Sequence, residues 1–123
     1  MSKKILIVDD EPNIVVSLEY LMKKEGFEVA VAVDGEAALE MVASFRPDLV
    51  LLDVMMPKKS GFEVCQALRG DQEHAGIKVV MLTAKGRESE AAKGIALGAD
   101  AYVTKPFSTK DLVARVKSLL HTE

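Results

Sequence analysis

The sequence predicts a doubly wound α/β sandwich, in which helices cover both faces of a parallel sheet. Five short apolar runs alternate along the chain with five stretches whose apolar residues recur at helical spacing. Three central runs, ILIV, LVLL and VVML, are apolar at every position. Such runs are typical of parallel strands that are buried on both faces. With 123 residues the chain has the length of one domain, and we expect residues 1–123 to form it.

Local signals place each element in turn. Strands are expected within residues 4–9, 27–35, 47–53, 77–84 and 100–107. Helices are expected within residues 13–26, 35–45, 60–70, 88–99 and 108–120. Each helix has a plausible start or stop residue: Pro12 and Gly26 for the first, Asp34 for the second, Ser60 for the third, Gly98 for the fourth, and Ser108 with Asp111 for the last.

The composition indicates a cellular compartment and the classes of partner that are not expected. The net charge of −3 is mildly acidic, so direct nucleic-acid binding by this segment is not expected. A single cysteine allows no internal disulfide and suits a reducing compartment. No apolar run reaches membrane-spanning length, and the N-terminal apolar run is too short for a signal peptide. We therefore expect a cytoplasmic protein without a membrane partner.

Polar side chains gather at the predicted strand ends. The first strand ends in Asp9 and Asp10, the third in Asp53, the fourth in Thr83 and the fifth in Lys105. In such sheets, ligands bind beyond the carboxyl ends of the strands. Converging carboxylates repel one another, so a cation is needed beside the lysine. An all-oxygen ligand set favours Mg²⁺, with Mn²⁺ possible, and the site suits an incoming phosphoryl group.

These motifs together resemble the receiver domain of two-component response regulators, including the chemotaxis regulators. The matching stretches are VDDE, LLDVMMP, MLTA and YVTKPF, in that order along the whole chain. The resemblance implies a flavodoxin-like (βα)5 fold with strand order 2-1-3-4-5 and a single receiver domain over residues 1–123.

The resemblance also implies a role for each acid. Asp53 would be the phosphoacceptor, taking a phosphoryl group from a sensor histidine kinase or a phosphotransfer protein. Asp10, Asp53 and the backbone carbonyl of Met55 would hold Mg²⁺, and Asp9 would act through a water molecule. Lys105 would neutralise charge on the transferring group.

Further implied roles concern the response to phosphorylation. The Thr83 hydroxyl would turn toward the phosphoryl group and Tyr102 would move inward, which would change the surface of the fourth helix, fifth strand and fifth helix. That surface would control an output partner or a further effector domain. We expect a monomer before phosphorylation and allow a dimer through that surface afterwards. Family members usually have a cis peptide at the position of Lys105–Pro106.

Three alternatives stay open at this point. Asp9 and Asp10 could be N-cap residues of the first helix, and Asp53 a turn cap. A phosphatase of the haloacid dehalogenase type would also use an aspartyl phosphate, but its Asp-x-Asp-x-Thr/Val pattern differs from DDEPN here. A non-phosphorylated scaffold typically lacks one acid or the lysine. The expected protein catalyses only its own phosphorylation and autodephosphorylation, so we do not expect an enzyme in the usual sense.

The output class is also open. Winged-helix DNA-binding relatives usually carry a basic residue at the position of Ala91 and an acid at that of Ala101. Asp111 and Arg115 do match the dimer pattern of those relatives. The mixed match favours a stand-alone regulator or another output class, with a receiver cut from a larger protein as the alternative.

Overall fold

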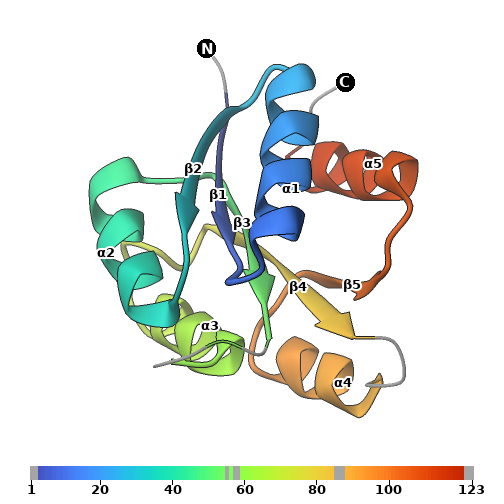
Figure 1. Cartoon of the computed structure of the whole chain (residues 1–123). Coiled ribbons are helices and arrows are strands. Elements are labelled where there is room, and N and C mark those ends of the chain that lie inside the picture. The colour runs from blue at the N-terminus through green and yellow to red at the C-terminus, as the bar shows by residue number, and fades with distance from the viewer. Residues whose placement is uncertain (1–2, 55, 57–58, 85–87, 121–123) are drawn as a thin grey trace.

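A computed structural model describes residues 3–54, 56, 59–84 and 88–120. Its strands are Lys4–Val8 (β1), Glu28–Ala32 (β2), Leu49–Asp53 (β3), Lys78–Ala84 (β4) and Ala101–Lys105 (β5). Its helices are Pro12–Lys24 (α1), Gly35–Phe45 (α2), Gly61–Arg69 (α3), Glu88–Ala96 (α4) and Thr109–Leu120 (α5). Strands and helices alternate throughout, as Figure 1 shows.

The five strands form one parallel sheet in the order β2-β1-β3-β4-β5. This confirms the predicted fold class and strand order. The chain runs from β1 outward to β2 and then returns to the other side of β1 to form β3. The strand order therefore reverses between β1 and β3, which is where sheets of this kind bind ligands.

The sheet is covered on both faces (Figure 1). On one face, apolar residues of β1 and β3 pack with Leu18 and Met22 of α1 and with Leu112 and Val116 of α5. On the other face, the remaining strand residues pack with α2 and α3, and α4 contacts β4, β5 and α3. Because β1 and β3 contribute side chains to both cores, their continuous apolar runs are explained.

The predicted caps are present where the structure describes them. The Asp34 side chain accepts a hydrogen bond from the Ala37 amide, and Ser60 and Glu63 form a complete capping box. The Asp111 amide donates to the Ser108 hydroxyl at 3.3 Å. The first helix differs, because its N-cap is Glu11 and no side chain caps it. The alternative that Asp9 or Asp10 is this N-cap is therefore wrong.

Within the described ranges, no helix is both long enough and apolar enough to cross a membrane.

Candidate functional site

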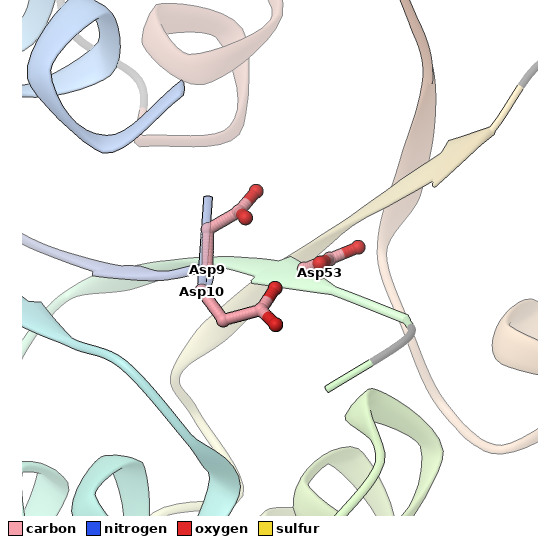
Figure 2. Close-up of side chains that lie close together, drawn as sticks. All are labelled: Asp9, Asp10 and Asp53. Carbon is pink, nitrogen blue, oxygen red and sulfur yellow. The ribbon is translucent and has the colours of Figure 1, made fainter. Parts of the chain in front are cut away.

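Three carboxylates meet at the switch point of the sheet. Asp9 and Asp10 directly follow β1, and Asp53 is the last residue of β3. One oxygen from each carboxylate lies within 4.8 Å of the others, and Figure 2 shows the three side chains gathered at this edge. Asp9 is fully buried, Asp53 is 7% exposed and Asp10 is exposed. Buried carboxylates are uncommon in proteins unless they are paired or bind a cation.

Lys105 supplies a positive charge to this cluster. Its Nζ atom donates to Asp9 Oδ2 at 2.8 Å and to Glu11 Oε1 at 3.3 Å. It also forms an ion pair with Asp53 Oδ1 at 3.6 Å. The last residue of β5 is therefore tied to the ends of both β1 and β3.

The pKa of Lys105 is raised above its ordinary value. Burial alone lowers it, but the hydrogen bond to Asp9 and the charges of Asp53 and Asp9 outweigh that effect. Lys105 therefore carries a full positive charge at neutral pH.

A pocket of about 270 Å³ opens above these groups. Its lining combines charged and apolar residues: Asp10, Glu11, Asp53, Val54, Leu82, Ala84 and Lys105. Among these lining residues, three carboxylates face one ammonium group. With buried Asp9 included, these described side chains carry four negative charges and one positive charge, a net charge of −3.

The donor set fits a hard divalent cation. Two carboxylates about 5 Å apart repel each other by roughly 3 kcal/mol at an effective dielectric constant of about 20. A Mg²⁺ ion between them would remove this repulsion, and Mg²⁺ prefers one or two carboxylates together with water and phosphate oxygens. The Asp9, Asp10 and Asp53 oxygens match that preference in type and spacing.

The other predicted site residues lie on β4, on β5 and just after β5. Thr83 is next to last in β4 and is buried, directly after Leu82, the register partner of Asp53. Tyr102 of β5 is 41% exposed and lines a separate groove with Arg115. The Lys105–Pro106 peptide bond is cis, the isomer expected. Met55 lies outside the described residues.

Sequence reasoning did not assign Glu11 to the site, yet its carboxylate contacts Lys105. A signal was available, because N-cap positions favour Ser, Thr, Asp and Asn, and glutamate is unusual there. Gly61 was also missed. A Cβ atom at Gly61 would overlap the backbone carbonyl oxygen of Asp53 and lie 3.0 Å from Val54 Cα. The glycine lets α3 begin directly against the end of β3.

Comparisons with known proteins give matches over nearly the whole chain. Residues 5–117 match the family model described as the response regulator receiver domain. The alkaline phosphatase synthesis transcriptional regulatory protein PhoP of Bacillus subtilis (strain 168) is 49% identical over 120 residues, which are 98% of this chain and 49% of PhoP. The chain thus spans about half the length of this curated relative.

Two solved structures show the same fold. A protein of Chloroflexus aurantiacus J-10-fl assigned as a response regulator has a TM-score of 0.95 and 35% identity, covering 98% of this chain and 99% of that one. The chemotaxis response regulator CheY4 of Vibrio cholerae has a TM-score of 0.90 and 30% identity, covering 97% of this chain and 99% of that one.

Proposed function

Because the chain belongs to the response regulator receiver domain family, we propose that it is a signalling switch whose phosphoacceptor is Asp53. One observation carries this proposal: the Asp53 carboxylate ends β3 inside a pocket that also holds Asp10 and Lys105, with Asp9 beneath. Receiver domains act with histidine kinases in two-component systems, so the phosphoryl donor is a phosphohistidine of a kinase or of a phosphotransfer protein.

The proposed reaction is a single phosphoryl transfer. An oxygen of Asp53 bonds to phosphorus, and the bond from phosphorus to the donor imidazole nitrogen breaks. The imidazole keeps the electron pair and takes up a proton, and Asp53 becomes an acyl phosphate. Lys105, 3.6 Å from Asp53 Oδ1, is placed to neutralise charge on the transferring oxygens. Water later hydrolyses the acyl phosphate, so no separate substrate is turned over.

A divalent metal ion is part of this proposal. Asp10 and Asp53 would hold Mg²⁺ directly, Asp9 would act through a water molecule, and the Met55 carbonyl would complete the protein ligands. Mn²⁺ has the same ligand preference and is a possible substitute. When bound, the ion supplies positive charge that stabilises the transferring phosphoryl oxygens.

The proposed output is a change at the surface of α4, β5 and α5. Thr83 would turn its hydroxyl toward the phosphoryl group and Tyr102 would move into the space that this turn leaves. The exposed ring of Tyr102 and the exposed side chain of Ile95 on α4 support this, because both can lose solvent contact when the surface changes. An output partner, an effector domain or a second copy of the chain would bind there, and the unphosphorylated chain would be a monomer.

The test is intact mass spectrometry after incubation with acetyl phosphate and Mg²⁺. We expect one added phosphoryl group on the wild-type chain, and none when Mg²⁺ is removed with a chelator. Asp53→Asn should give no adduct while keeping the fold, since the substitution is nearly isosteric and removes one charge from a repelling cluster.

A matched variant makes the test specific. Asp71→Asn removes an exposed acid after α3, outside the residues that line the pocket, and should be phosphorylated like the wild type. A folded wild-type chain that takes up no phosphoryl group would contradict the proposal and favour a scaffold. An adduct that persists in Asp53→Asn would move the acceptor to another residue.

A further inference from the structure

The Glu11 side chain pairs with a residue far away in sequence and does not cap the helix that it begins. Glu11 is the N-cap residue of α1, and its side chain caps none of the free amides of that helix. It instead reaches Lys105, which is 94 residues away in sequence, with Oε1 3.3 Å from Nζ. Glutamate in this uncapped position leaves the helix start less stable than Ser or Asp would.

The contact contributes little to folding. The Glu11 side chain is 62% exposed, and an ion pair with such an exposed partner typically adds little to stability. Asp9, which is fully buried, already provides the stronger partner of Lys105 at 2.8 Å. Stability alone therefore does not account for the placement of Glu11, and its effect on Lys105 needs a separate explanation.

Lys105 has three N–H donors to share. Asp9 and Glu11 accept hydrogen bonds from it, whereas its distance of 3.6 Å to Asp53 Oδ1 exceeds hydrogen-bond distance and is that of an ion pair. A phosphoryl group on Asp53 would add new acceptor oxygens on the open side of the pocket. The Lys105 ammonium would have to turn toward these oxygens. Its two present hydrogen-bond partners differ in burial, because Asp9 is fully buried whereas Glu11 is exposed to solvent.

We propose that Glu11 is a positioning residue that competes with the Asp53-bound phosphoryl group for Lys105. The inference rests on the proposed function, because it assumes that a phosphoryl group forms on Asp53. In the unphosphorylated chain Glu11 holds the ammonium in its resting place. The Glu11–Lys105 pair thereby destabilises the phosphorylated state relative to the unphosphorylated state.

The test measures binding of fluoroberyllate, a tetrahedral phosphoryl mimic, to the full chain at saturating Mg²⁺ by amide NMR titration. Glu11→Gln should bind the mimic about two- to fivefold more tightly than the wild type, which is the range expected when one exposed ion pair no longer competes. Glu36→Gln, which removes an acid from the first turn of α2, is the matched control and should leave the dissociation constant unchanged.

A second variant separates competition from a general effect of charge. Glu11→Asp keeps the negative charge but has a shorter side chain, and aspartate at an N-cap prefers the helix amides. Competition for Lys105 predicts that Glu11→Asp binds fluoroberyllate as tightly as Glu11→Gln. A simple charge effect predicts that it behaves like the wild type, which would overturn the proposal.

Other outcomes also decide the matter. Unchanged or weaker binding in Glu11→Gln would overturn the competition, because the pair would then be inert or helpful. The urea unfolding midpoint should differ little between the wild type and Glu11→Gln, and it should rise in Glu11→Asp, whose carboxylate can cap α1. A purely structural role of Glu11 predicts no change in the fluoroberyllate affinity of Glu11→Gln. If the wild type itself neither binds the mimic nor gains a phosphoryl group from acetyl phosphate, the proposed function fails instead.

Discussion

Lys105 differs from an ordinary surface lysine in having carboxylates on several sides. Its side chain is 15% exposed, and its ammonium lies within 3.6 Å of oxygens from Asp9, Glu11 and Asp53. A buried carboxylate that loses such a partner is left without compensation, which is strongly destabilising. We therefore expect Lys105→Met to lower the free energy of unfolding while impairing phosphorylation.

The pH dependence of this effect has a definite sign. The pKa of Lys105 is raised in the folded state, despite the lowering effect of burial, by the hydrogen bond to Asp9 and the nearby charges. A raised pKa gives stability that is fully present below the unfolded value, near 10.4, and is lost as pH rises through the folded value. The stability difference between wild type and Lys105→Met should therefore stay constant from about pH 7 to 9 and shrink above about pH 10.5.

Urea unfolding midpoints across this pH range measure that difference. Lys110→Met removes an exposed lysine from the start of α5 and controls for the loss of one lysine. A difference that instead grows with alkaline pH would show that the Lys105 pKa is lowered in the folded chain.

Arg46 is a second residue that leads to a testable prediction, because its backbone conformation is unusual for a residue with a side chain. It ends α2 in the left-handed region, with φ of 54°, where a residue with a side chain is disfavoured and glycine is not. Its ion pair with Glu73, at 3.5 Å, joins two exposed side chains and contributes little. Arg46→Gly should raise the free energy of unfolding by about 0.5–1 kcal/mol.

The matched variant for this position is Arg46→Ala, which removes the ion pair and keeps the backbone strain. It should be neutral or slightly destabilising in the same denaturation experiment. Equal stabilisation by alanine and glycine would mean that the arginine side chain, and not its backbone conformation, is unfavourable.

At the scale of elements, the start of α3 packs closely against the backbone at the end of β3. Gly61→Ala would place a Cβ atom against the Asp53 carbonyl oxygen, so either α3 or the end of β3 must move. Backbone atoms cannot yield as a side chain can, and we expect a loss of at least about 2 kcal/mol of stability together with slower phosphorylation.

Gly70→Ala tests the other end of the same helix. Gly70 has a right-handed helical conformation, and a Cβ atom there would come no closer than 3.4 Å to Gln66 O. Thermal unfolding should show this variant to be as stable as the wild type or slightly more stable. Similar losses in both glycine variants would indicate that α3 tolerates no substitution, and would remove the special role of Gly61.

The elements themselves were largely predictable from sequence. Continuous apolar runs predicted the central strands because β1, β3 and β4 contribute side chains to the cores on both faces of the sheet. Capping by Asp34 and Ser108 was predicted, and Ser60 was placed near the start of its helix, because these contacts span only three residues. The acids and the lysine of the site were found because parallel strands bring their carboxyl ends to one edge.

Contacts between distant residues were not predictable in the same way. The Glu11 carboxylate could have capped α1, remained in solvent or paired with Lys105, and only the packed structure selects among these. The need for glycine at Gly61 depends on how closely α3 approaches β3, which no local pattern records. The same holds for Arg69, whose side chain donates to three backbone carbonyls and to Asp100.

At the scale of the whole molecule, β5 connects the proposed phosphorylation site to the proposed output surface. Lys105 at its end lies in the acidic pocket, while Tyr102, three residues earlier, is exposed beside α5 and lines a surface groove of about 370 Å³ with Arg115. Thr83 is the register partner of Thr104, which lies between them on the same strand. A movement of Thr83 and Lys105 toward a phosphoryl group can therefore reach Tyr102 through one short strand.

This coupling predicts a change in exposure that can be measured at a single residue. Tyr102 should become protected from hydroxyl-radical labelling when fluoroberyllate and Mg²⁺ are added to the full chain, as its ring moves inward. Tyr20 on α1 is 69% exposed and remote in sequence from the switch, so it is an internal control whose labelling should not change. Peptide mass spectrometry reports both residues in one sample.

The Thr83→Ala variant tests whether binding of fluoroberyllate is enough to protect Tyr102 or whether the Thr83 hydroxyl is also needed. It removes the hydroxyl that would turn toward the phosphoryl group, and it leaves Asp10 and Asp53 in place to bind Mg²⁺ and the mimic. We expect this variant to bind fluoroberyllate, with weaker affinity, while Tyr102 stays labelled as in the resting chain. Protection of Tyr102 in both the wild type and Thr83→Ala would show that the ring responds to the phosphoryl group without the Thr83 hydroxyl.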